Sequence, residues 1–75
     1  MYKDIINLSD VKAVKDFSVM ANEYKFPILL VSDEYKVDAK SIMSIFSLDL
    51  SKPVAVEIEN ECPEELKQRI QTFKD

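Results

Sequence analysis

Apolar and polar residues recur along the chain at two periods, and each change of period marks a new element. Stretches that alternate at every second residue predict strands with one covered face, and stretches with an apolar residue every three or four positions predict amphipathic helices. The predicted order is strand 2–7, helix 11–24, strand 28–31, strand 35–38, helix 42–48, strand 54–61 and a last helix that begins at Pro63.

The longest helical pattern covers residues 11–24. Asp10 precedes it as a natural N-cap, and Pro27 blocks its continuation because proline lacks an N–H and disfavours helical geometry at the residue before it. The predicted buried stripe consists of Val11, Val14, Phe17, Ala21 and Tyr24.

The strand at 54–61 shows the cleanest alternation of the chain. Its apolar side is predicted to face the core and its acidic side to face water. These two sets are Val54, Val56 and Ile58 on one side and Glu57, Glu59 and Glu61 on the other. Pro63 then suits the first position of the last helix, whose buried stripe is Leu66, Ile70 and Phe73.

The order βαββαβα predicts an α+β fold, an open-faced β-sandwich with a four-stranded antiparallel sheet and all helices on one face. The strands at 28–31 and 35–38 form a hairpin, and because the chain has no glycine its turn needs either a left-handed Asp33 or a right-handed turn type. Leu29 and Val31 leave apolar surface on the open side, which is either a weak homodimer contact or an isolated exposed aliphatic.

The short helix at 42–48 combines a cap with two apolar faces. Ser41 is its predicted N-cap, because the hydroxyl can accept a hydrogen bond from a backbone N–H of the first turn. Ile45 and Leu48 share an inward face, while Met43 and Phe46 are rotated toward solvent. Some apolar surface is therefore predicted to remain available to a partner.

The composition narrows the classes of function. The 75 residues are predicted to form one domain, 1–75, with a net charge of −4 and no basic stripe, which argues against nucleic acid and membrane surfaces as partners. The start of the chain lacks a targeting pattern, so we expect a cytoplasmic protein.

Cys62, the single cysteine, is expected to be inert, and no spacing of acids or cysteines predicts a metal or a cofactor. Lys67 and Arg69 are predicted to be ordinary surface residues of the last helix.

The segment Lys40-Ser41-Ile42-Met43, followed by Ser47-Leu48, resembles the regulatory-serine segment of HPr, the histidine-containing phosphocarrier of the bacterial sugar phosphotransferase system. The resemblance extends from about Asp10 to Phe73 and implies the same open-faced fold. It places Asp10 where the family has its phosphorylated histidine and Lys12 where it has an arginine. The chain contains no histidine, so it lacks the imidazole that a phosphohistidine relay needs, and we expect neither that relay nor an enzyme.

Three hypotheses about function follow. In the first, the chain is a regulatory adaptor that binds protein partners, namely an HPr-kinase-like enzyme and transcriptional or transport regulators. Its binding residues would be Lys12, Ile42, Met43 and Phe46, with Ser41 either a cap alone or a cap that is also phosphorylated. In the second, the chain is a structural or oligomerisation module that uses Leu29 and Val31. In the third, Asp10 is an aspartyl phosphocarrier; its simpler roles are a helix cap or a mimic of phosphohistidine.

Overall fold

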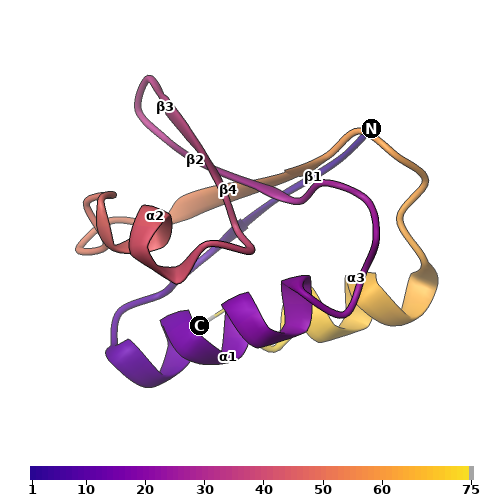
Figure 1. The fold of residues 1–75 in the computed structure, drawn as a ribbon, viewed down its shortest axis with the longest axis horizontal. Helices are drawn as coiled ribbons and strands as arrows, with labels where there is room; N and C mark the ends of the chain where they lie inside the picture. The colour runs from indigo at the N-terminus through magenta and orange to yellow at the C-terminus, as the bar shows by residue number, and fades with distance from the viewer. Residues whose placement is uncertain (75) are drawn as a thin grey trace.

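The computed structural model describes residues 1–74, which form a four-stranded antiparallel sheet with the helices on one face (Figure 1). The elements are β1 (Tyr2–Ile6), α1 (Val11–Ala21), β2 (Leu29–Ser32), β3 (Tyr35–Asp38), α2 (Ile42–Phe46), β4 (Val54–Ile58) and α3 (Glu64–Gln71). The strands lie in the order β1-β4-β2-β3, and every neighbouring pair is antiparallel. The predicted fold class and element order are therefore confirmed.

The core lies between the sheet and the helices α1 and α3, which run side by side beneath it in Figure 1. Phe17 of α1, Val56 of β4 and Leu66 of α3 are fully buried there. The ring of Phe73, just after α3, meets the ring of Phe17 edge-on at a centroid distance of 5.0 Å and an angle of 76°. This geometry is favourable for aromatic pairs and joins the two helices at the margin of the core.

Helix α1 ends earlier than its pattern predicts. Asn22 is the C-cap, and its amide donates hydrogen bonds to the carbonyl oxygens of Ser18 (2.8 Å) and Lys40 (3.0 Å). Such side-chain bonds to the backbone favour the end of a helix, so Tyr24 lies in the following turn at the margin of the core. Val11 was wrongly predicted to be buried and is 61% exposed, because the first turn of α1 projects past the end of α3 (Figure 1).

Strand β4 shows the largest departure from the pattern. It lies between β1 and β2, and all five of its residues are buried. Glu57, predicted to face water, is only 8% exposed, and its carboxylate oxygens lie 3.6 Å from Lys3 Nζ and 3.4 Å from Lys36 Nζ. Alternation reports the face of a sheet on which a residue lies, but a central strand is covered even on its open face by the long side chains of its neighbours.

The chain enters α3 through a cap rather than through a helical proline. Pro63 has a ψ of 144° and is the N-cap, so the prediction that it is the first helical residue is wrong. Leu66 and Ile70 are buried as predicted, and Phe73 packs against the core while half-buried. Burial raises the pKa of the Cys62 thiol, which fits the expectation of an inert cysteine.

The open face of the sheet carries an apolar row across three strands. Ile5 of β1 lies opposite Ala55 of β4, and Ala55 lies opposite Val31 of β2. Leu29 lies two residues from Val31 on the same face, and both are half-buried. Leu29 and Val31, which were predicted to leave apolar surface on the open side of the sheet, therefore both lie on that side.

The β2–β3 hairpin turns through a left-handed residue. Asp33 has a φ of 54°, the only positive φ among residues 1–74, and Ser32 lies opposite Tyr35 across the turn. Of the two turn geometries that the sequence left open, the one with a left-handed Asp33 is present. An aspartate tolerates this region better than most residues, because its short polar side chain can bond locally.

We expect Asp33→Gly to raise the free energy of unfolding by up to about 1 kcal/mol and Asp33→Val to lower it by about 1–2 kcal/mol, because only glycine adopts this φ without steric cost. Urea titration followed by circular dichroism measures both. Glu34→Gly is the matched control: Glu34 has a negative φ, so glycine there should be neutral or destabilising. Equal effects of the two glycine variants would contradict the explanation.

Candidate functional site

The start of α1 is held by Asp10. Its backbone is extended, with φ −135° and ψ 166°, and its Oδ1 accepts a hydrogen bond of 2.7 Å from the backbone N–H of Ala13. The side chain is exposed, so the negative charge lies at the positive end of the α1 dipole within reach of solvent. The predicted N-cap is confirmed, and this bond occupies one of the two carboxylate oxygens.

Lys12 is the second residue of α1, and its side chain is directed along the helix toward Asp16. Its Nζ is 2.9 Å from Asp16 Oδ2, an i,i+4 ion pair on the surface of α1. The hydrogen bond to Asp16 raises the pKa of the Lys12 ammonium. The cation predicted to accompany Asp10 is therefore paired with Asp16, although the pair is exposed and open to exchange with a bound anion.

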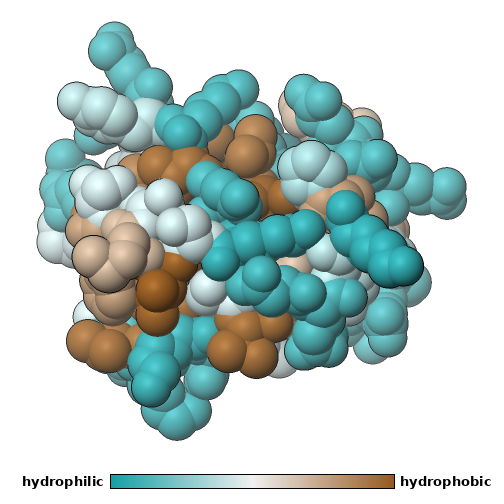
Figure 2. Space-filling view, viewed as in Figure 1, coloured by the Kyte–Doolittle hydropathy of each residue, from teal (hydrophilic) through white to brown (hydrophobic). Residues whose placement is uncertain are grey.

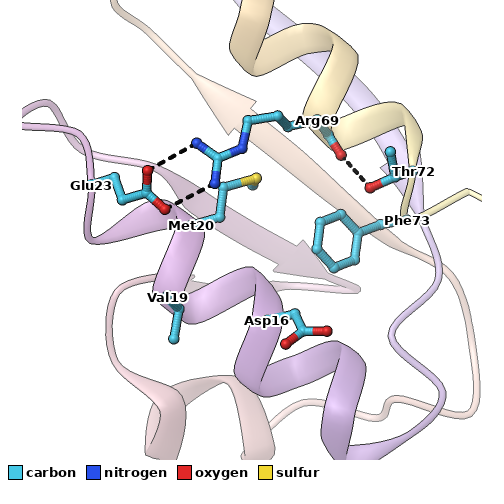
Figure 3. Close-up of a pocket in the computed structure, with 7 residues that line it drawn as sticks. All are labelled: Asp16, Val19, Met20, Glu23, Arg69, Thr72 and Phe73. Carbon is cyan, nitrogen blue, oxygen red and sulfur yellow. Dashed lines mark hydrogen bonds and ion pairs between the residues drawn. The ribbon is translucent and has the colours of Figure 1, made fainter.

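A hollow separates the start of α1 from the end of α3. It has a volume of about 280 Å³ and is lined by Asp10, Lys12, Ala13, Asp16, Thr72 and Phe73. A second hollow of about 390 Å³ shares the last three of these residues and extends along α1, where Val19, Met20, Glu23 and Arg69 line it (Figure 3). Apolar side chains and charged ones share the walls of this shallow groove. Among residues 1–74 no group of three His, Cys, Asp or Glu residues is placed to hold a metal ion.

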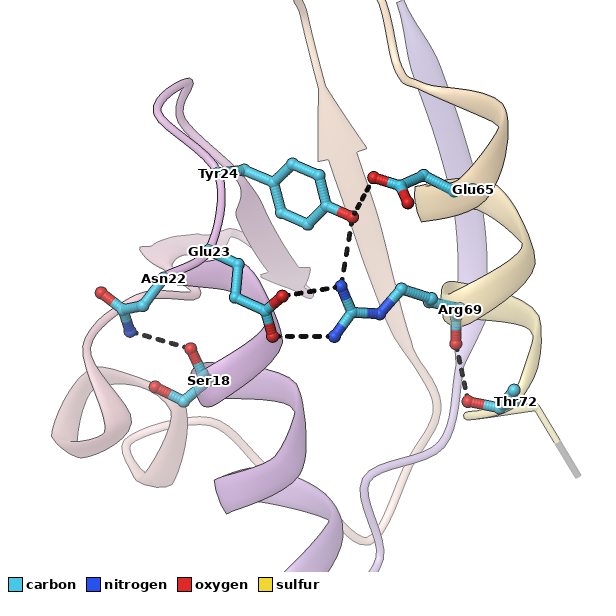
Figure 4. Close-up of polar contacts among 7 residues, drawn as sticks. All are labelled: Ser18, Asn22, Glu23, Tyr24, Glu65, Arg69 and Thr72. Carbon is cyan, nitrogen blue, oxygen red and sulfur yellow. Dashed lines mark hydrogen bonds and ion pairs between the residues drawn. The ribbon is translucent and has the colours of Figure 1, made fainter.

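Arg69 closes the far end of this groove and joins α3 to α1 (Figure 4). Its guanidinium donates to both carboxylate oxygens of Glu23, at 2.8 and 3.1 Å, and to the hydroxyl of Tyr24 at 3.2 Å. Tyr24 in turn donates to Glu65 Oε1 at 3.2 Å. The bidentate contact lowers the pKa of Glu23 and raises that of Arg69.

The description of Arg69 as an ordinary surface residue is therefore wrong, because its partners lie about 45 positions away in the sequence. No spacing rule links residues at such a separation, whereas the Lys12–Asp16 pair has the i,i+4 spacing of a local helical contact.

Helix α2 is the second part of the candidate site. Ser41 Oγ accepts hydrogen bonds from the backbone N–H of Ser44 (3.4 Å) and from its hydroxyl (3.1 Å), so the predicted N-cap is confirmed. Ile45 is fully buried, whereas Met43 is 76% exposed and Phe46 43% exposed. Ile42 is half-buried beside the core. The two faces predicted for this helix are present.

The entrance of α2 is fastened to the second half of α1. The carbonyl oxygen of Lys40 accepts hydrogen bonds from Ser18 Oγ (3.3 Å) and from the Asn22 amide (3.0 Å). Ser41 therefore lies near Ser18 and Asn22, which are two to three turns along α1 from Asp10. Helix α2 and the first half of α1 lie at the same end of the molecule in Figure 1, and Ser41 is not among the residues that line the hollow beside Asp10.

Apolar side chains gather on this side of the molecule. Figure 2 shows brown patches over α2 and along α1 at the lower left of the view. The large apolar residues exposed on these two helices are Val11, Val19, Met43 and Phe46. Val11 and Val19 were not predicted as surface contacts, so the exposed apolar area is wider than the sequence indicated. No helix of residues 1–74 is long and apolar enough to cross a membrane.

The arrangement defines a small α+β fold, an open-faced sandwich with a capped first helix and a short second helix packed against it. The family model for the HPr component of the phosphotransferase system, described by its phosphorylation site, matches residues 10–73. The chain belongs to this HPr family.

Two solved structures agree with this assignment. The chain is similar to HPr-C-His from Thermoanaerobacter tengcongensis, with 26% identity and a TM-score of 0.79 over 96% of this chain and 89% of that one. It shares the fold of the phosphocarrier protein HPr from Bacillus anthracis str. Ames, with 22% identity and a TM-score of 0.74 over 99% and 96% of the two chains. No protein of curated function matches the chain.

Proposed function

We propose that this HPr-family chain is a cytoplasmic regulatory adaptor that does not transfer phosphate through histidine and binds protein partners through the start of α1 and through α2. The observation that carries the proposal is Met43, 76% exposed on a helix whose opposite side is buried. A methionine kept in solvent beside buried Ile45 costs free energy that a partner would recover.

The start of α1 supports the loss of phosphotransfer. The chain has no histidine, and Asp10, at the position that the resemblance gives to the family's histidine, uses one oxygen to cap α1. Lys12 contacts Asp16. The exposed charges of Asp10 and Lys12 then contribute to recognition, since rim charges of this kind mainly set specificity and association rate.

The apolar part of the proposed partner-binding surface consists of Ile42, Met43 and Phe46. A pull-down from the source cell, comparing the parent with a Met43→Asp/Phe46→Asp double variant, tests it. We expect the variant to lose a specific interactor, because two charges would be buried without partners at the centre of the contact. Tyr35→Asp is the matched control, since Tyr35 is 71% exposed and lies outside α2, at the start of β3. An interactor that survives the double variant, or that is lost equally in the control, would refute the adaptor surface.

We further propose that Ser41 is phosphorylated by an HPr-kinase-like enzyme. Its hydroxyl already lies at the N-terminal end of a helix, where added negative charge is favourable, so the fold should persist while the surface beside Met43 gains about −1.5 to −2 charges. The modification would then change partner choice rather than stability.

Labelling with such a kinase and radioactive ATP tests this proposal. We expect Ser41→Ala to abolish incorporation and Ser44→Ala, one turn away and hydrogen-bonded to Ser41, to retain it. Equal incorporation of phosphate into the parent and Ser41→Ala would refute regulation through Ser41. It would not affect the proposal that the chain is an adaptor.

The apolar row on the open sheet face favours a second candidate, an oligomerisation module that uses Leu29 and Val31. A concentration-dependent dimer that is lost in Leu29→Lys/Val31→Lys would support it. The aspartyl-carrier hypothesis needs base-labile, hydroxylamine-sensitive phosphate on Asp10 after incubation with phosphoenolpyruvate and the first enzyme of the system. Under the adaptor proposal we expect no label on any residue in that assay.

A further inference from the structure

The outer edge of β3 presents a row of backbone donors and acceptors at one side of the sheet. Within residues 1–74, β3 pairs with β2 alone and ends the sheet. The Ala39 N–H donates to the Ile28 carbonyl at 2.9 Å, so Ala39 and Ile28 form a hydrogen-bonded pair. This pair determines which residues of β3 bond to β2 and which face outward. Because antiparallel partners alternate between bonded and non-bonded pairs, Tyr35 and Val37 bond inward to β2, while Lys36 and Asp38 direct their backbone N–H and C=O groups outward.

The opposite edge, β1, is not equivalent. Lys74 Nζ lies 2.8 Å from Asp4 Oδ1, and Gln71 Nε2 donates to Asp4 Oδ2 at 2.8 Å, so the end of the chain is fastened to this strand. Two β1 strands paired about Asp4 would also place like charges directly opposite each other, which is destabilising. Self-association through a sheet edge is therefore favoured at β3.

We propose that β3 pairs with β3 of a second copy of this chain, antiparallel about a two-fold axis at Val37. In such a pair, residues directly opposite each other point to the same side of the joined sheet. The open faces of both copies therefore lie on the same side only if the two opposed residues have numbers that add up to an even value. An axis at Lys36 would put two lysines opposite each other. An axis at Val37 puts Lys36 opposite the partner's Asp38 and Asp38 opposite the partner's Lys36, with the two valines between them.

The backbone of β3 fits the same register. Lys36 and Asp38 are the outward-bonding residues, so each opposed pair can exchange two N–H to C=O hydrogen bonds. The Asp38 carbonyl already accepts the Ser41 N–H at 3.1 Å, and its second lone pair remains to accept from the partner strand. Lys36 Nζ, 3.4 Å from Glu57 and with a side chain 61% exposed, would lie between two carboxylates in the dimer.

A second copy is the occupant that the charge pattern selects, because one strand supplies both members of the complementary pair. The joined edges bury much less than the roughly 1,200 Å² of a standard stable interface, so we expect a weak dimer with a Kd on the order of 10⁻⁴ to 10⁻³ M. The two four-stranded sheets would become one continuous sheet. This inference is independent of the adaptor role and of a contact through the open face.

Amide exchange by NMR across a concentration series is the first test. In the monomer the Lys36 and Asp38 amides face outward, so we expect them to gain protection as concentration rises, while the amides of Val37 and Tyr35 are protected throughout. Sedimentation equilibrium measures the dimer in parallel. A parent protein that remains monomeric at millimolar concentration, or protection that rises in β1 instead, would overturn the proposal.

Charge reversal supplies the matched comparison. Lys36→Glu should weaken the dimer at least tenfold because Glu would face Asp38 of the partner copy, while Lys3→Glu should leave it unchanged. The two lysines are close equivalents, with side chains 61% exposed for Lys36 and 58% exposed for Lys3, so each variant loses one ion pair to Glu57. Lys36→Pro removes one outward N–H and should also abolish dimerisation. Equal weakening by Lys3→Glu and Lys36→Glu would refute the β3 edge as the interface.

Discussion

Replacing Phe17 with alanine is expected to lower the free energy of unfolding by about 3–5 kcal/mol, the cost of removing a large ring from a closely packed core. The Phe17 side chain is fully buried on α1, and its ring contacts that of Phe73 at 5.0 Å. A domain of this length has a total stability of about 4–11 kcal/mol, so the variant would retain little of it. Urea unfolding followed by far-ultraviolet circular dichroism measures the change.

Two further variants keep this prediction testable if Phe17→Ala does not fold. Phe17→Leu retains most of the buried volume and should cost about 1–2 kcal/mol. Val19→Ala, on the same helix but 64% exposed, should change stability by no more than about 0.5 kcal/mol. A loss below about 1 kcal/mol for Phe17→Ala would mean that α1 and α3 are not joined through this ring.

The order of elements could be predicted because each one carries its own periodic signal. The short helix is the clearest example: its spacing separated buried Ile45 and Leu48 from exposed Met43 and Phe46, and the cap at Ser41 was readable from residue type alone. These are local properties, set by helix geometry within a few residues. The hairpin was likewise predictable except for its turn type, which a chain without glycine leaves open.

The predictions that were wrong have a common physical cause. In each case the burial or the partner of the residue depends on neighbours that are distant in sequence. Glu57 is buried because β4 is the central strand between Lys3 and Lys36, and strand order is not encoded in the alternation of one strand. Arg69 binds Glu23 across the groove between α3 and α1. Val11 has the right spacing for the core but is exposed, because it lies in the first turn of α1, which projects past the end of α3 (Figure 1).

The local parts of the candidate site could be predicted, and the parts that depend on distant elements could not. Asp10 and Ser41 were identified as helix caps from local rules, and both caps are present. The groove that runs from Asp10 to Arg69 needed the placement of α3 against α1, because its two walls come from opposite ends of the chain. The resemblance to HPr indicated positions, but it did not show that Lys12 is paired with Asp16.

The protein is expected to lose stability as the pH falls below about 4, and Asp4 should account for a large part of the loss. Asp4 accepts hydrogen bonds from Lys74, Gln71 and its own neighbour Ile5, and these hold its pKa well below the ordinary value of 3.8. A carboxyl group whose pKa is depressed by folding stabilises the native state above its unfolded pKa and ceases to do so as the pH falls toward its folded pKa. Glu23, whose pKa Arg69 lowers, acts in the same direction.

Urea titrations of the parent and of Asp4→Asn at pH 7, 5 and 3 test this linkage. At pH 7 the variant should be less stable by about 1–2 kcal/mol, because asparagine keeps the shape but loses the charge that strengthens the bonds from Lys74 and Gln71. The difference should begin to shrink toward pH 3, because below about 3.8 the Asp4 carboxyl of the unfolded parent takes up a proton while that of the native parent stays ionised. Glu34→Gln, at the exposed hairpin tip, is the control and should track the parent at every pH. A gap between parent and Asp4→Asn that stays constant with pH would show that the charge of Asp4 does not fasten β1 to the end of the chain.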